Sequence, residues 1–146
     1  SNNRQILEVN MSRRLAREIA LQVLYQIDLT GETNNIASII DNWAIEFAVS
    51  AKNIPFIKQL VVGTLDNIED IDNKINLFAH EWALDRMSVV DRNLMRLAVY
   101  EMLYCPEIPQ KVTLNEAIEI AKKFGGDDSA RFINGILDKI MSLTKK

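Results

Sequence analysis

The chain has 146 residues, of which 48% are hydrophobic and 25% charged, a composition typical of one globular domain with a real core. A formal net charge of −3 argues against a protein whose whole surface coats nucleic acid, but it allows a local basic patch. No apolar run approaches the roughly 20 residues that span a bilayer, and no stretch is typical of a signal peptide. The single cysteine, Cys105, rules out an internal disulfide. We therefore expect a cytoplasmic protein that binds no membrane.

Hydrophobic periodicity predicts an all-α fold. Only five glycines and three prolines interrupt the chain, and no alternating strand pattern occurs. Ser88 and Asp91 have the spacing of a capping box, in which each side chain binds a free backbone N–H at a helix start. Gly63 lies inside a predicted helix, which favours close helix packing at that point. The predicted helices cover residues 12–29, 36–50, 56–76, 77–84, 88–104, 113–124 and 127–140. They form one domain over residues 1–146, with residues 1–11 flexible.

The last two helices meet at a sharp corner. Thr113 and Glu116 repeat the capping-box spacing at the start of the first of them. Gly125 occupies the position where a helix end favours a left-handed residue. Asp127 and Asp128 follow the glycines, and we expect them to cap the next helix and to complement its dipole.

Residues able to carry catalysis are sparse. His80 is the single histidine and Cys105 the single cysteine, so no cluster has metal-ligand spacing. Gly125 and Gly126 lack the preceding strand and following lysine of a phosphate-binding loop. The sequence therefore predicts a protein that is not an enzyme, with no catalytic residue, no metal and no cofactor.

The charges are distributed unevenly along the chain. Arg13, Arg14 and Arg17, here called the arginine cluster, lie at the predicted start of the first helix. Arginine donates paired hydrogen bonds to phosphate, and cations at a helix start oppose the dipole, which favours a functional reason for them. The alternative is a solvated helix start. Residues 66–91 are predominantly acidic and suit a basic partner.

A second candidate group contains Arg131 and Phe132. The ring of Phe132 could stack on an unpaired base while Arg131 and the helix start serve the adjacent phosphates. Periodicity alone favours the alternative that Phe132 belongs to the core with Ile136.

Two segments resemble the NusB family of transcription antitermination factors. RRLAREIALQVLY at residues 13–25 resembles the N-terminal signature of that family. NEAIEIAKKFG at residues 115–125 and FINGILD at residues 132–138 resemble its C-terminal signature. The matches lie at both ends of the chain in the family's order, so the resemblance covers nearly the whole sequence.

The resemblance implies a NusB-like fold of about seven helices in two perpendicular small bundles. It also implies binding of boxA RNA in ribosomal RNA transcripts, together with the small-subunit ribosomal protein that acts as NusE, within an antitermination complex on RNA polymerase. By position, the family's RNA-binding residues and its partner-facing residues form two sets. The RNA-binding set is Arg13, Arg14, Arg17, Asp128, Arg131 and Phe132, and the partner-binding set is Tyr25 and Asp91.

We expect the two ends of the chain to pack together and form one composite RNA site. The protein would be a monomer or a homodimer. Two alternatives remain from other functional classes. The chain could be a NusB-like accessory RNA-binding domain of a ribosomal RNA methyltransferase, or a helical interaction module that binds only protein.

Overall fold

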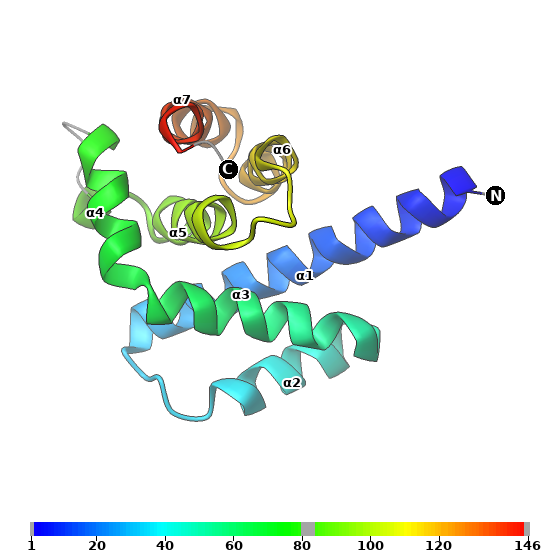
Figure 1. Ribbon diagram of the computed structural model, residues 1–146. Helices are drawn as coiled ribbons and strands as arrows, with labels where there is room; N and C mark the ends of the chain where they lie inside the picture. Colours follow the sequence, from blue (N-terminus) through cyan, green and yellow to red (C-terminus); the bar gives the residue numbers. More distant parts are fainter. Residues whose placement is uncertain (1, 80–83, 145–146) are drawn as a thin grey trace. The chain divides into compact units, whose positions relative to one another are not determined.

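A computed structural model describes the backbone of residues 2–79 and 84–144 (Figure 1). Within these ranges the chain forms seven α-helices and two short 3-10 helices, and no strand. The predicted all-α fold is therefore confirmed. The helices are α1 (Asn2–Thr30), α2 (Ile36–Glu46), α3 (Ile54–Asp66), α4 (Ile68–Ala79), α5 (Val89–Tyr104), α6 (Gln110–Phe124) and α7 (Asp127–Leu143). The 3-10 helices are η1 (Ala51–Asn53) and η2 (Leu84–Arg86). No helix in the described part of the chain is long and apolar enough to cross a membrane.

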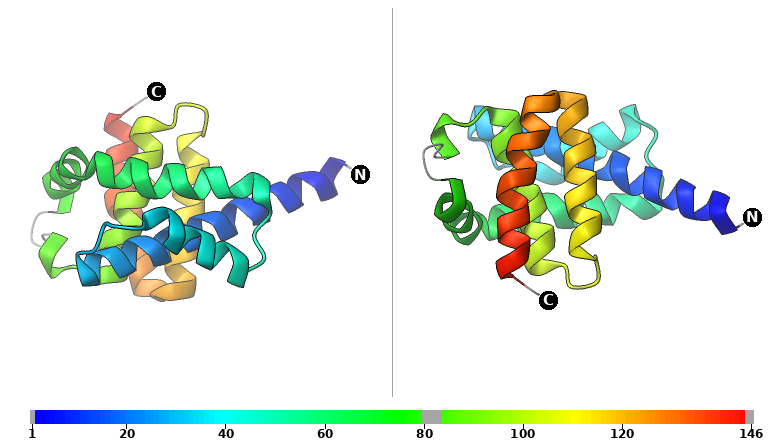
Figure 2. Two further views of the ribbon diagram at one scale, coloured as in Figure 1. Left: turned by 90° about the horizontal axis from the view of Figure 1, so that it is seen from below. Right: turned by 90° about the horizontal axis from the view of Figure 1, so that it is seen from above.

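The chain divides into two compact units, Ser1–Val62 and Gly63–Lys146, with the boundary inside α3. In the first unit, α1 packs against α2 and η1. In the second unit, α6 and α7 lie side by side, and both pack against α5 (Figure 2). The largest fully buried side chains of the second unit come from α4, α5, α6 and α7. They are Ile71, Ile75, Leu94, Met95, Leu97, Met102, Ile120, Ile133 and Leu137.

Helix α1 begins ten residues earlier than predicted, because it starts at Asn2 rather than at Ser12. No glycine or proline interrupts residues 2–30, so a continuous run of helix-compatible residues outweighs the capping preference of one serine. The predicted flexibility of residues 1–11 stays a prediction. The earlier start places the arginine cluster well inside α1. The dipole acts only within the first turn, so it gives no reason for or against these arginines.

The long helix predicted over residues 56–76 is two helices, because α3 ends at Asp66 and α4 begins at Ile68. Asn67 separates them: its Nδ2 donates to the carbonyl of Gly63 at 2.8 Å and competes with the helical hydrogen bonds. The close packing expected at Gly63 is confirmed, since a Cβ at this position would overlap the ring of Tyr100. Helix α2 is also shorter than predicted and ends before Ala48, whose φ of 52° is left-handed.

The predicted helix starts fared differently. Ser88 caps α5 as predicted, since its side chain accepts a hydrogen bond from the Asp91 N–H at 3.1 Å. The capping role predicted for Thr113 is wrong because α6 begins earlier, at Gln110, directly after Pro109. Thr113 is buried inside α6, where its Oγ1 donates to Glu101 Oε1 at 3.1 Å.

The corner between α6 and α7 is present, but its details differ from the prediction. Gly125 has a φ of −123° and is not left-handed, whereas Gly126 has a φ of 90°. The N-cap of α7 is Gly126, and Asp127 and Asp128 lie within the first turn of the helix. Their capping role is therefore wrong, although their charges still complement the positive end of the helix dipole.

Candidate functional site

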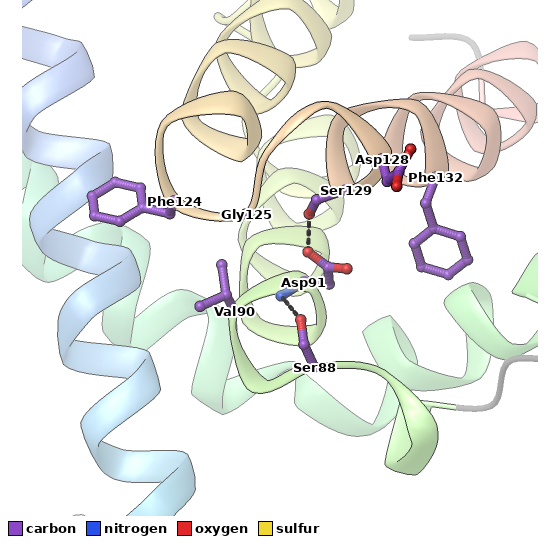
Figure 3. A pocket seen from close by; sticks show the side chains of 8 residues that line it. All are labelled: Ser88, Val90, Asp91, Phe124, Gly125, Asp128, Ser129 and Phe132. Atoms are coloured by element: carbon purple, nitrogen blue, oxygen red, sulfur yellow. Dashed lines mark hydrogen bonds between the residues drawn. The ribbon is translucent and has the colours of Figure 1, made fainter.

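A hollow of about 460 Å³ opens in the second unit where the starts of α5 and α7 meet the end of α6 (Figure 3). We call it the α5–α7 hollow. Its lining combines two phenylalanines, two aspartates, two serines, a valine and a glycine: Ser88, Val90, Asp91, Phe124, Gly125, Asp128, Ser129 and Phe132.

Hydrogen bonds fix the floor of the hollow. Ser129 Oγ donates to Asp91 Oδ1, and the backbone N–H of Asp91 donates to Ser88 Oγ. Gly125 allows this contact, because a Cβ there would lie 2.5 Å from Ser129 Oγ and 2.7 Å from Ser129 Cβ. A side chain at position 125 would displace Ser129 from Asp91. The starts of α5 and α7 are thus held together by side chains that the sequence alone did not connect.

Phe124 and Phe132 lie on opposite sides of the hollow, with Asp91 between them (Figure 3). Phe132 is half-buried, whereas Ile133 and Ile136 in the same helix are buried. Phe132 therefore lies at the margin of the core, and part of its surface remains available to a ligand. Phe124, at the end of α6, is also half-buried and lines the hollow.

Asp128 and Arg131 lie on the first two turns of α7, beside the hollow. They form an ion pair in which the Arg131 side chain is 75% exposed and the Asp128 side chain 94% exposed. Solvent screens such a pair, so it contributes little to stability. Both groups can therefore exchange this contact for one with a ligand at little cost.

The arginine cluster lies in the first unit, and its three members have different environments. Arg13 and Arg14 are exposed, whereas Arg17 is only 3% exposed. The Cζ atoms of Arg13 and Arg17 lie 4.5 and 5.5 Å from the centroid of the Phe56 ring. Two of the three arginines can therefore present their donors to an outside anion, and the third is packed inside.

Tyr25 and Asp91, the predicted partner-facing residues, are both half-buried. One carboxylate oxygen of Asp91 accepts a hydrogen bond from Ser129, and Asp72, in the same acidic stretch, forms an ion pair with Arg96. Asp72 and Asp91 are therefore less available to a basic partner than the sequence suggested, whereas Glu69, Asp70 and Asp85 are exposed.

No group of three or more His, Cys, Asp or Glu residues that could hold a metal ion occurs among the residues that the structure describes. His80 lies outside those residues, and Cys105 is buried. The predicted composite site would join residues of both units, and it stays a prediction.

The fold and these side chains define a small helical protein with two exposed arginines and a hollow lined by two phenylalanines and two aspartates. A family model described as the NusB family matches residues 14–142. The chain belongs to the NusB family.

Individual relatives agree with this assignment. The transcription antitermination protein NusB of Desulfitobacterium hafniense is 54% identical over 136 residues, which cover 93% of this chain and 92% of that protein. A structure of T. maritima NusB has a TM-score of 0.81 at 37% identity and covers 89% of this chain and 90% of that chain. A structure of the antitermination factors NusB and NusE in complex with double-stranded RNA has a TM-score of 0.80 at 28% identity. It covers 91% of this chain and 98% of that chain.

Proposed function

We propose that this protein is a transcription antitermination factor that binds boxA RNA of ribosomal RNA transcripts together with the ribosomal protein NusE. The pair assembles an antitermination complex on RNA polymerase in the cytoplasm. The protein works by binding and does not catalyse a reaction. The observation that carries the proposal is membership of the NusB family over nearly the whole chain.

Arg13 and Arg14 are the phosphate-binding residues of the first unit. Both side chains are exposed, and a guanidinium donates two parallel hydrogen bonds to one phosphate. Arg17 is buried, so we assign it a supporting role beneath Arg13 rather than a direct contact with RNA.

The α5–α7 hollow supplies the base-binding part of the second unit. An unpaired base can stack on the half-buried ring of Phe132, and stacking of this kind tolerates any base. Arg131 and the free N–H groups at the start of α7 serve the neighbouring phosphates. The Asp128 carboxylate accepts hydrogen bonds from base amino groups. It cannot bind a phosphate, because an ionised carboxylate has no hydrogen-bond donor.

NusE contacts Tyr25 in the first unit and Asp91 in the second unit. The half-buried state of both side chains leaves part of each available to a partner. The second oxygen of Asp91 is an acceptor for a basic side chain, because the Ser129 bond occupies Oδ1. A similar protein has been solved with NusE and double-stranded RNA, which supports a joint RNA-binding role for this chain.

A mobility-shift titration of a boxA RNA with this protein, with NusE and with both tests the proposal. We expect strong retention only by the pair. If this protein, NusE and the pair all fail to bind the RNA, the RNA-binding proposal is contradicted. The result then favours a helical module that binds only protein. A single-stranded and a double-stranded version of the same RNA should compete unequally, with the single strand ahead, because stacking on Phe132 needs an unpaired base.

A further inference from the structure

The face of an aromatic ring lies against two members of the arginine cluster in the first unit. Phe56, in the first turn of α3, has the Arg13 Cζ atom at 4.5 Å and the Arg17 Cζ atom at 5.5 Å from its ring centroid. Both distances are within the roughly 6 Å over which a ring attracts a cation. The ring is half-buried, Arg13 is exposed and Arg17 is buried.

The position of the Phe56 ring offsets the electrostatic repulsion between Arg13 and Arg17. Arg13 and Arg17 are four residues apart in one helix, so their positive charges lie on the same face and repel each other. The negative face of the Phe56 ring attracts both guanidinium groups and lowers that repulsion. The ring therefore gives a physical reason why two arginines can stay close together with one of them buried.

The geometry of a guanidinium allows the ring and a phosphate to bind at the same time. A guanidinium that stacks on a ring does so with its flat face, and its N–H donors then point outward in the plane of the group. A phosphate binds along that edge. Contact with Phe56 therefore leaves the donors of Arg13 open to RNA and restricts a side chain that is otherwise costly to order.

We propose that Phe56 is a positioning residue of the RNA surface, which holds Arg13 with its donor edge outward before RNA arrives. The inference rests on the proposed RNA-binding function. Phe56 itself touches no RNA, and its effect passes entirely through Arg13, with Arg17 as the buried support.

The test compares Phe56→Leu, which removes the ring face, with Phe56→Tyr, which keeps it. Affinity for boxA RNA is measured with NusE present at several salt concentrations. We expect Phe56→Leu to weaken binding about two- to fivefold, the range for a cation–π contact at an exposed site. Phe56→Tyr should stay within about twofold of the wild type, because its ring retains the negative face. Equal losses for the two variants would overturn the inference.

A double variant separates positioning from a general structural effect. In an Arg13→Gln background, Phe56→Leu should cause almost no additional loss, since the side chain that Phe56 positions is gone. Losses that add would overturn the inference. The slope of log affinity against log salt should also fall in magnitude by up to about 0.7 in Phe56→Leu, the value for one phosphate contact of a single strand.

Phe47→Leu is the matched control, because Phe47 is a half-exposed phenylalanine of the same unit that stacks on Trp43. Its RNA affinity should equal that of the wild type. Circular dichroism checks folding, and Phe56→Met replaces Phe56→Leu if the leucine variant unfolds. A wild-type pair that binds no boxA RNA would contradict the proposed function itself. Normal wild-type binding with unchanged affinity in the folded Phe56 variant would overturn only the inference.

Discussion

Ser129 Oγ donates a hydrogen bond to Asp91 Oδ1 across 38 residues of sequence. Because Ser88 accepts a hydrogen bond from the Asp91 backbone, Asp91 connects its own helix cap to the first turn of α7. The floor of the α5–α7 hollow is therefore built from residues that hold one another in place, and Phe132 projects from a helix whose start is fixed.

Ser129→Ala should destabilise the second unit. Among the described residues, Ser129 Oγ is the donor that binds Asp91 Oδ1, and the substitution removes it. We expect the free energy of unfolding to fall by about 1.5–2 kcal/mol, the lower part of the range for a bond to a charged group, because Asp91 is partly solvated. Urea unfolding measures the change. Ser142→Ala is the control, since its hydroxyl binds only the Asp138 carbonyl at an exposed site. Equal effects would contradict a special role for Ser129.

Local signals decided how much of this site the sequence could predict. Ser88 and Asp91 lie three residues apart within one cap, so their spacing alone predicted the bond that the structure contains. Thr113 and Glu116 have the same capping-box spacing, but Thr113 is buried inside α6 and its hydroxyl donates to Glu101 of α5 instead. The Ser129–Asp91 bond depends on how α5 and α7 pack, and no local pattern encodes it.

Periodicity identified the buried faces of the helices but not their edges. It placed Phe132 in the core, whereas the ring lies at the margin and lines the hollow. The sequence grouped Arg17 with Arg13 and Arg14 as a phosphate-binding arginine, yet its side chain is buried near Phe56. A residue at the edge of an apolar stripe is buried or exposed according to its tertiary neighbours, and the sequence of one helix does not contain them.

Gly63→Ala should destabilise the protein although alanine is the better helix former. The added Cβ would overlap the ring of Tyr100, which is buried and stacked on Tyr104 at 5.6 Å between centroids. A rigid, packed ring cannot move away cheaply, so overpacking of about 1–3 kcal/mol exceeds the propensity gain of about 1 kcal/mol. Thermal and urea unfolding test this. Tyr100→Leu should remove most of the penalty when combined with Gly63→Ala, and simple additivity of the two changes would contradict the overlap.

Asp72→Asn should weaken the connection between α4 and α5. Arg96 Nε and Nη2 donate to the two carboxylate oxygens of Asp72 at 2.8 and 3.0 Å. The Arg96 side chain is 13% exposed and the Asp72 side chain 25% exposed. We expect a loss of about 1–3 kcal/mol, between the values for exposed and fully buried pairs. Asp41→Asn, which breaks an exposed pair with Lys58 at 3.7 Å, is the control and should cost less than about 1 kcal/mol. A larger loss in the control would refute this ranking.

Phe132→Leu tests base stacking in the α5–α7 hollow. Leucine retains apolar volume at a half-buried position but has no ring face for a base. Removal of one stacked base costs about 1–3 kcal/mol, which corresponds to a loss of roughly 5- to 150-fold in affinity. The loss should be confined to boxA RNA with an unpaired base, measured with NusE present. An equal loss for a fully paired RNA would show that Phe132 acts through protein structure instead.

Arg14→Ala and Arg17→Ala should separate the two functions within the arginine cluster. Arg14 is exposed, so its replacement should leave the free energy of unfolding within about 0.5 kcal/mol of the wild type. If it contacts one phosphate, the salt slope of RNA binding falls in magnitude by about 0.7. Arg17 is buried beside Phe56, so its replacement removes packed stem atoms and lowers stability.

The salt slope of Arg17→Ala should stay close to that of the wild type, because its guanidinium reaches no phosphate. Salt-dependent titrations and urea unfolding of both variants supply the comparison. Normal stability and a reduced salt slope in Arg17→Ala would show that Arg17 contacts RNA directly, as the sequence predicted. The opposite pattern would show that one basic run supplies both a binding surface and the packed support beneath it.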